Sequence, residues 1–324
     1  MYTSQEILEK VNSYLDHLPY DREPQSLYDP IRYVLDIGGK RIRPVLMLLS
    51  CNIFSEEVDP LLPVACGLET YHNYTLLHDD LMDQAPLRRG KPTVHTKWDA
   101  NTAILSGDSM LVLAFQRMAQ CPDRLLRQVL DIFTETALQI GEGQQYDMDF
   151  EHRNDVTEDE YINMIRLKTS VLLACACQIG ALAGDASERQ ARQLYDFGLQ
   201  LGLAFQLQDD YLDVYGDTET FGKAIGGDIL SNKKTYMLIN AFARADEGQR
   251  RELERWTTLE DFDPQEKISA VKRIYGEVGI DRLAQDKIGH YFDNCEQILQ
   301  QLDVPGERKA PLRDYARSLM NRKN

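Results

Sequence analysis

The sequence predicts an all-α protein, and three observations support this fold class. Apolar residues recur at helical spacing over long stretches, strand patterns are scarce, and helices do not alternate with strands as they would around a parallel sheet. Glycine and proline fall mainly between the helical stretches, where they mark turns. No short repeat or low-complexity block divides the chain. We therefore expect one domain over residues 1–324, a bundle of roughly ten or more helices.

The clearest helical patterns lie in three stretches. Residues 101–118 are mostly apolar, residues 158–183 have the same character, and residues 190–212 repeat apolar side chains at helical spacing without a proline. The polar segment 245–264 contains the helix-compatible run RRELERW, so we expect a helix there and not a linker between domains. Turns are expected at Gly38-Gly39, Pro86, Gly90, Gly226-Gly227 and residues 302–311.

The net charge argues against nucleic acid as the main partner. The chain has 36 Lys and Arg against 52 Asp and Glu, a formal net charge of −16, whereas a phosphate backbone is bound by concentrated positive charge. The N-terminal segment lacks the basic start and apolar run of a signal peptide. No stretch approaches the roughly 18–20 uninterrupted apolar residues of a membrane helix, so we expect no stable membrane insertion.

The cysteines indicate a reducing compartment. None of the six forms a CxxC pair or has a histidine at metal-ligand spacing. Cysteines without such a pattern usually behave as small core hydrophobes. We therefore expect a cytoplasmic protein.

One acidic pattern occurs twice. Asp79-Asp80-Leu81-Met82-Asp83 and Asp209-Asp210-Tyr211-Leu212-Asp213 are both DDxxD, and each follows an apolar helical run. Residues four apart in a helix are stacked one turn apart, so the first and last carboxylates of each motif share a face. Three like charges repel unless a cation lies among them, and Mg²⁺ prefers carboxylate and phosphate oxygens. A single copy is usually a solvated helix surface, but two copies at the ends of apolar helices predict metal sites.

Basic clusters accompany the acidic motifs. GGKRIRP at residues 38–44 places three cations beside a double glycine, and Arg88-Arg89-Gly90-Lys91 comes soon after the first DDxxD. In a chain of this acidity, such basic clusters are explained most simply as part of an anion-binding site, in which a metal ion and arginine side chains bind the anion together. A diphosphate is bound in this way.

These motifs together resemble a known family. GGKRIRP, LLHDDLMD followed by APLRRGKPTVH, GQQYD, LKTS, FQLQDDYLD and FGKAIGGDILSNKK occur in the order and approximate spacing of the trans-isoprenyl diphosphate synthases (the polyprenyl synthetase family). Each motif alone is weak, but six in order are specific. The resemblance covers nearly the whole chain. It implies the isoprenoid synthase fold, a helix bundle around a central apolar cavity, and a homodimer.

The resemblance implies Mg²⁺ as the cofactor, with three ions in each active site. Asp79, Asp83 and Asp147 resemble ligands of the ions on an allylic diphosphate, and Asp209 resembles the ligand of a further ion. The full set of aspartates expected at the metal is Asp79, Asp80, Asp83, Asp147, Asp209, Asp210 and Asp213. Metal polarises the diphosphate that leaves, whereas basic side chains suffice for the one that is only held.

Two further sets of residues are expected at the substrates. By resemblance, the residues at the allylic diphosphate are Arg88, Lys168 and Lys223, and Lys233 is a further substrate-binding residue that supports or closes the site. Thr169 and Gln206 match positions that face the allylic cation, whose charge their oxygens stabilise. The expected catalytic residues are Lys168, Thr169, Gln206 and Lys223. The residues that resemble the pocket for isopentenyl diphosphate are Lys40, Arg43, His72 and Arg89.

Some of these residues also fit a purely structural interpretation. His72 alone fits an ordinary helix histidine, and Lys223 an ordinary surface lysine. Thr169 could bond back to its own helix, and Gln206 could be a satisfied core amide. The sequence leaves both interpretations open.

The resemblance implies ionisation, condensation and elimination. The diphosphate leaves an allylic starter (dimethylallyl, geranyl or farnesyl diphosphate), and the double bond of isopentenyl diphosphate attacks the resulting cation. A proton is then lost to the released diphosphate. The cavity must exclude water, because water would quench the cation.

The helix before the first DDxxD predicts a short product. In the family this helix forms one wall of the product tunnel, and positions −8, −5 and −4 from Asp79 are Tyr71, Tyr74 and Thr75. Tyr74 lies roughly 7–8 Å below the carboxylates at the helical rise per residue. We expect it to stop elongation at C15 or C20, with C20 favoured. The two-residue insertion seen in the first motif of many bacterial farnesyl synthases is absent here.

Two other interpretations remain open at this point. A class I terpene cyclase shares the all-α fold and one DDxxD but has a different second metal motif and no isopentenyl diphosphate pocket. A non-catalytic helical subunit of a heteromeric synthase typically lacks the acidic motifs. The second DDxxD and the intact GGKRIRP favour the synthase over both.

Overall fold

The computed structural model describes residues 1–216 and 225–321. These residues are mostly helical and form more than ten helices, which confirms the all-α prediction. The chain folds into two compact units. The first comprises Met1–Glu135, Cys175–Tyr195 and Leu302–Tyr315, and the second Thr136–Ala174, Asp196–Gln301 and Ala316–Asn324. That both units form one functional domain stays a prediction.

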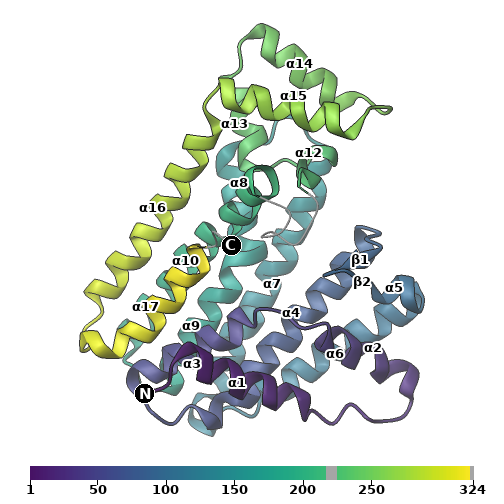
Figure 1. Cartoon of the computed structure of the whole chain (residues 1–324). Coiled ribbons are helices and arrows are strands. Elements are labelled where there is room, and N and C mark those ends of the chain that lie inside the picture. Colours follow the sequence, from purple (N-terminus) through teal and green to yellow (C-terminus); the bar gives the residue numbers. More distant parts are fainter. Residues whose placement is uncertain (217–224, 322–324) are drawn as a thin grey trace. The chain divides into compact units, whose positions relative to one another are not determined.

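Most elements of the first unit lie in its N-terminal part (Figure 1). The elements that begin in this unit are α1 (Ser4–Asp16), α2 (Gln25–Asp36), α3 (Ile42–Phe54), η1 (Asp59–Leu61), α4 (Leu62–Met82), β1 (Leu87–Arg88), β2 (Lys91–Pro92), α5 (Val94–Lys97), α6 (Ala100–Met118), η2 (Asp123–Leu125), α7 (Leu126–Glu151), α10 (Glu188–Tyr215) and α17 (Gly306–Met320).

Helix α4 is the centre of the first unit. It packs along α6 and also touches α1, α2 and α3, as Figure 1 shows. Buried apolar side chains from these helices, such as Ile31, Leu77 and Met110, form a common core. This packing fixes the last turn of α4, which carries the first acidic motif.

A small hairpin that the sequence did not predict follows α4. Strands β1 and β2 pair antiparallel with Leu87 opposite Pro92 and Arg88 opposite Lys91. Arg89 and Gly90 form the turn, with φ angles of 52° and 74°, which suits a two-residue turn whose central residues both have positive φ. With only two residues in each strand, the hairpin leaves no period-two pattern in the sequence.

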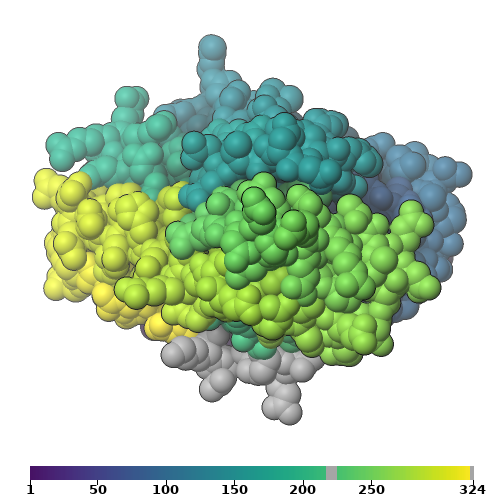
Figure 2. All heavy atoms as spheres, turned by 90° about the horizontal axis from the view of Figure 1, so that it is seen from above, coloured from purple at the N-terminus to yellow at the C-terminus, as the bar shows by residue number. Residues whose placement is uncertain are grey.

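The second unit is also helical. The elements that begin in it are α8 (Glu158–Ile165), η3 (Arg166–Ser170), α9 (Val171–Ala183), α12 (Gly227–Leu230), α13 (Tyr236–Arg244), α14 (Glu247–Thr258), α15 (Pro264–Glu277) and α16 (Ile280–Gln301). Helices α13, α14, α15 and α16 pack on one another, and α12 packs on α15. Figure 2 shows α14 and α15 (green) with their outer faces on the surface.

Two predicted elements differ from the structure. The stretch 158–183 is interrupted by η3, a π-helical turn, where backbone approach is close: a Cβ on Gly143 would collide with the backbone of Lys168. The expected turn 302–311 is shorter than predicted, because α17 already begins at Gly306 and continues through Pro311. Proline costs that helix one hydrogen bond, but the buried side chains Leu312 and Leu319 keep it packed.

The helix expected in 245–264 is confirmed as α14. It is capped by Asp246, whose carboxylate accepts the amides of Gly248 and Gln249. This N-cap explains why the polar segment does not remain a loop.

Within the part of the chain that the structure describes, one stretch, residues 158–183, is long and apolar enough to cross a membrane. However, 78% of its most apolar window is buried inside the protein. A core helix of a soluble protein passes the same test.

Candidate active site

The first acidic motif ends helix α4. Asp79 and Asp80 lie in its last turn, and the amide of Asp83 still donates to the Asp79 carbonyl at 2.9 Å. Asp80 is buried, and Nε of Arg88 lies 2.7 and 2.8 Å from its two carboxylate oxygens. Asp79 is partly exposed and lies 3.7 Å from Nη2 of the same arginine, and Asp83 is exposed. The middle carboxylate therefore anchors Arg88 most closely, whereas the last faces solvent.

The double glycine receives Arg89 from the hairpin turn. Gly38 and Gly39 have φ angles of 85° and 152°, which glycine adopts without steric cost. Nη1 of Arg89 donates to the Gly38 carbonyl, and a Cβ on Gly39 would come within 2.7 Å of the same nitrogen. The two basic motifs of the sequence, GGKRIRP and RRGK, therefore meet within the first unit.

A buried ion pair holds the basic loop against α4. Arg41 is only 6% exposed, and its Nη1 lies 3.0 Å from Oε1 of Glu69. Its Nη2 donates to the Leu35 carbonyl at 2.6 Å, and Asn73 donates to the same Glu69 oxygen at 3.3 Å. Sequence reasoning assigned no role to Arg41 or Glu69. The pair fixes the segment in which the exposed Lys40 precedes Arg41.

His72 lies on α4 among the arginines of these motifs. Burial holds the pKa of His72 well below its ordinary value, and the charges of Arg43, Arg89, Arg88 and Arg41 act in the same direction. Arginine charges near enough to lower the pKa of His72 indicate a positive local potential in a protein of net charge −16. Such a place suits an anion, as expected for the isopentenyl diphosphate pocket.

The three residues expected to limit product length lie below the motif on α4. The Tyr74 ring lies 5.5 Å from that of Tyr71 and 4.9 Å from that of His78. Tyr71 is buried and packs edge-on against Phe133 at 5.2 Å. Thr75 donates to the carbonyl of His72, in its own helix. The rings of Tyr71 and His78 therefore pack against the Tyr74 ring.

The second acidic motif lies wholly within α10. Asp209 is partly exposed, whereas Asp210 and Asp213 are buried. Asp210 accepts hydrogen bonds from the Tyr161 hydroxyl and, at 3.0 Å, from the Gln206 amide. Burial raises the pKa of Asp210, and the charge of Asp228 adds to the shift.

Asp213 ties the motif to the loop that follows it in the described chain. One of its carboxylate oxygens accepts the amide of Asp228 at 2.9 Å. The amide of Gly226 donates to the Asp213 carbonyl at 2.6 Å. The motif and the GGDI segment thus form one hydrogen-bonded structure.

The π-helical turn η3 presents two of the expected catalytic residues. Thr169 donates to Oε1 of Gln206 at 3.0 Å, so the expected pair at the allylic cation is in direct contact. Lys168 lies 2.7 Å from Asp147, and Lys233 lies 3.9 Å from the same carboxylate oxygen. Burial would raise the pKa of Asp147, but the ammonium groups of Lys233 and Lys168 hold it below its ordinary value.

The structure groups the predicted residues in two sets. The first unit holds Lys40, Arg43, Tyr71, His72, Tyr74, Thr75, Asp79, Asp80, Asp83, Arg88 and Arg89, and the second unit holds Asp147, Lys168, Thr169, Gln206, Asp209, Asp210, Asp213 and Lys233. Lys223 lies outside the described residues. Sequence reasoning missed Tyr161, because nothing in its local sequence marks it as a partner of Asp210.

The donor chemistry suits Mg²⁺. Within residues 1–216 and 225–321 no three His, Cys, Asp or Glu side chains already gather around a metal position. The partly exposed Asp79 and Asp209 and the exposed Asp83 offer the hard oxygen ligands that Mg²⁺ prefers alongside phosphate.

Arg88 should stabilise the fold as well as the site. Replacing it with methionine leaves Asp80 buried without its guanidinium, and we expect a loss of about 2 kcal/mol in the free energy of unfolding, less than for a fully buried pair because Arg88 is partly exposed. Urea unfolding measures this. Adding Asp80→Asn should recover most of the loss. Arg32→Met, which removes an exposed pair with Asp29, should cost under about 0.5 kcal/mol. Equal costs for both arginines would contradict the structural role of Arg88.

Comparisons with known proteins agree on one family. The model of the polyprenyl synthetase family matches residues 24–277. The geranylgeranyl diphosphate synthase of Methanosarcina mazei is 42% identical over 236 residues, 72% of this chain and 73% of that protein. The geranylfarnesyl diphosphate synthase of Natronomonas pharaonis is 38% identical over 245 residues, 70% of this chain and 71% of that protein.

A solved structure resembles the whole chain. The crystal structure of a geranylgeranyl pyrophosphate synthase superimposes with a TM-score of 0.95 at 42% identity, covering 100% of both chains. The family match, the relatives and this structure confirm what the ordered motifs predicted. The chain belongs to the polyprenyl synthetase family, among its short-chain trans-isoprenyl diphosphate synthases.

Proposed function

We propose that this enzyme condenses isopentenyl diphosphate with an allylic diphosphate to give a trans-prenyl diphosphate of C20. The observation that carries the proposal is the meeting of the two basic motifs, in which Arg89 of the hairpin donates to the Gly38 carbonyl of GGKRIRP. A terpene cyclase needs no second diphosphate and has no use for this basic cluster. Both acidic motifs are also intact, unlike those of a non-catalytic subunit.

Mg²⁺ supplies the charge that polarises the departing diphosphate. We propose three ions, held through Asp79, Asp83, Asp147 and Asp209 with the diphosphate oxygens and water. Asp80, Asp210 and Asp213 complete the motifs and already accept hydrogen bonds from Arg88, Tyr161 and the Asp228 amide, respectively. These contacts orient each motif before substrate arrives.

Each remaining residue has a task in the three steps. Arg88, Lys168, Lys223 and Lys233 bind the allylic diphosphate and stabilise its negative charge as it leaves. The Thr169–Gln206 pair turns oxygen atoms toward the developing cation, and their mutual hydrogen bond holds them there. Lys40, Arg43, His72 and Arg89 hold isopentenyl diphosphate. The released diphosphate takes the proton in the last step.

Tyr74 should limit chain length. Replacing it with alanine removes the ring that Tyr71 and His78 brace, so we expect products longer by at least one isoprene unit. Chromatography of the dephosphorylated products measures the length. Tyr28→Ala is the matched control, because Tyr28 is partly buried against the same core as Tyr74. An unchanged product from Tyr74→Ala would place the limit elsewhere.

A homodimer is the proposed assembly. Ile104, Leu105 and Val112 lie on α6 and are 44%, 60% and 59% exposed. Because large exposed apolar patches mark contact surfaces, Leu105→Glu should convert a dimer into a monomer. Light scattering on a size-exclusion column measures the mass. Asn12→Asp, which adds the same charge on the exposed side of α1, should leave the dimer intact. A monomeric wild type would contradict the proposal.

Cytoplasmic location and small-molecule partners complete the proposal. All six cysteines are buried free thiols, which suits a reducing compartment. We propose no nucleic acid partner and no stable membrane insertion.

The test of the proposed product is a starter series. The purified protein is incubated with Mg²⁺, isopentenyl diphosphate and, in separate reactions, dimethylallyl, geranyl or farnesyl diphosphate. We expect C20 from every starter. A C15 end product from dimethylallyl or geranyl diphosphate would overturn the proposed length, and C25 would match the named product of the Natronomonas pharaonis relative.

A further inference from the structure

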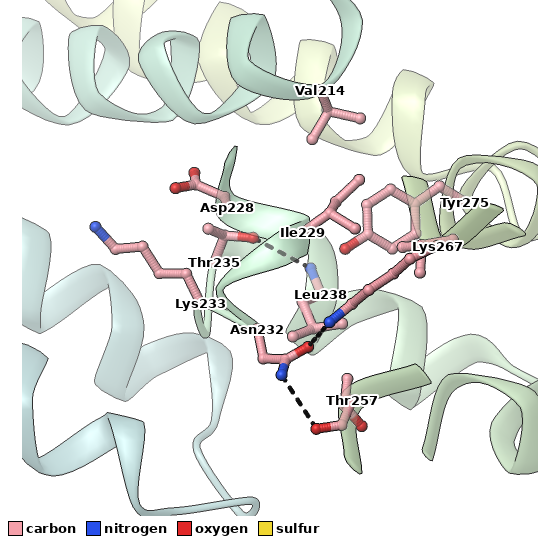
Figure 3. A pocket seen from close by; sticks show the side chains of 11 residues that line it. Val214, Asp228, Ile229, Asn232, Lys233, Thr235, Leu238, Thr257, Lys267 and Tyr275 are labelled. Carbon is pink, nitrogen blue, oxygen red and sulfur yellow. Dashed lines mark hydrogen bonds between the residues drawn. The ribbon is translucent and has the colours of Figure 1, made fainter. Parts of the chain in front are cut away.

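Lys267 is a buried lysine outside every motif. It lies in α15 with 0% of its surface exposed, and lysine is almost never fully buried unless it has partners. Its Nζ donates to Oδ1 of Asn232 at 2.7 Å and to the Leu230 carbonyl at 3.2 Å. It also lies 4.2 Å from the centre of the Phe262 ring. Figure 3 shows the ammonium directed at Asn232. The charge is therefore used to hold a turn.

That turn depends on side-chain contacts. Asn232 has a φ of 56°, a conformation that costs free energy for residues other than glycine, though less for asparagine than for most. Its amide nitrogen donates to the Thr257 carbonyl at 3.1 Å, the second dashed contact of Asn232 in Figure 3. Lys267 on one side and Thr257 on the other thus hold Asn232 in its left-handed conformation.

The same turn carries two groups of the proposed site. The amide of Lys233 donates to the Asp228 carbonyl at 3.0 Å, which closes the turn. From one end of it the amide of Asp228 donates to Asp213, and from the other the Lys233 ammonium lies 3.9 Å from Asp147. In Figure 3 the Lys233 side chain extends away from the side on which Lys267 enters. Among the described residues, the hydrogen bonds of Lys267 thus lead to the site through the turn.

We propose that Lys267 is a positioning residue: through Asn232 it fixes the turn 228–233 and so brings Lys233 to the allylic diphosphate. This inference rests on the proposed function for its catalytic consequence. Its structural step, the fixing of the turn, does not.

Hydrogen exchange tests the structural step. The amides of Ser231, Asn232 and Lys233 are bonded inside the turn. In Lys267→Met we expect them to exchange at least ten-fold faster, while other segments keep their rates. Lys309→Met is the matched control, since Lys309 is also buried and bonds a carbonyl, that of Leu302, at 2.8 Å. Unchanged exchange in the turn of Lys267→Met would overturn the inference.

Kinetics test the catalytic step. Lys267→Met should lower kcat about ten-fold or more, with KM for isopentenyl diphosphate within two-fold of wild type. Since a smaller folded fraction would also lower the apparent kcat at unchanged KM, kcat is expressed per folded protein, whose amount urea unfolding measures. Asn232→Gly keeps the left-handed backbone but removes the acceptor, and should lower kcat as much. In a Lys233→Ala background, Lys267→Met should add less than a two-fold loss, because its effect passes through Lys233.

The outcomes separate the two claims. Full additivity of Lys267→Met and Lys233→Ala would overturn the positioning role. A wild-type protein that consumes no isopentenyl diphosphate would overturn the proposed function instead, and hydrogen exchange would still decide whether Lys267 fixes the turn.

Discussion

Asp79→Asn should reduce kcat about 10³-fold, a loss of about 4 kcal/mol of transition-state stabilisation. Asp79 is the partly exposed first carboxylate of its motif, so we expect the change to remove a metal ligand and leave the fold intact. Asparagine keeps the shape and one oxygen but loses the charge. Steady-state rates over a range of Mg²⁺ concentrations measure the effect, and the concentration for half-maximal rate should rise in the variant.

Two comparisons make the Asp79 result specific. Asp16→Asn changes an exposed aspartate of α1 in the same unit and should leave kcat within two-fold of wild type. Urea unfolding should give Asp79→Asn nearly the wild-type stability. A kcat within ten-fold of wild type for Asp79→Asn would refute its role as a metal ligand.

Lys168→Met should give the second largest loss, about 10²-fold or more in kcat. The change removes a positive charge that we place at the departing diphosphate. Of the two ammonium groups near Asp147, those of Lys168 and Lys233, the change leaves only that of Lys233, at 3.9 Å. Lys168→Arg should retain more activity because it keeps the charge, although a guanidinium does not match the geometry of an ammonium. Single-turnover rates separate this effect from product release.

The control for Lys168 comes from the same unit. Lys287 forms a comparable ion pair with Glu158 at 2.8 Å, and its side chain is similarly exposed. Lys287→Met should leave kcat within two-fold of wild type. Equal losses in the two variants would mean that removing any such lysine perturbs the second unit, and Lys168 would lose its assigned role.

The regular part of the fold was predictable because it rests on local pattern. The stretches 101–118 and 190–212 match α6 and α10 to within a few residues, since their apolar side chains recur at helical spacing. The π-helical turn η3 leaves no such trace, because it depends on glycines of other helices. Gly143 in α7 lets the backbone of Lys168 come close to that helix, and Gly202 in α10 lets Ser170 come close to α10. Pro311 misled the prediction because a proline normally marks a helix end.

The sequence proposes which residues form the candidate site but does not reveal their contacts. Repeated DDxxD motifs and basic clusters identify which side chains gather charge. They do not reveal that Arg88 binds Asp80, or that Tyr161 binds Asp210 from 49 residues away. Lys267 gave no signal, since a lysine within EKISAVKR resembles any surface lysine. Its burial depends on Asn232, 35 residues earlier.

The central claim is that this enzyme condenses two substrates, an allylic diphosphate and isopentenyl diphosphate. The release of inorganic diphosphate tests this claim most directly. The protein is incubated with Mg²⁺ and an allylic diphosphate, with and without isopentenyl diphosphate, and free diphosphate and prenyl chains are counted together. We predict that release requires isopentenyl diphosphate, with one diphosphate freed for each isopentenyl unit added to the chain. Release from the allylic diphosphate alone, with no isopentenyl diphosphate consumed when it is supplied, would contradict the claim and indicate a cyclase.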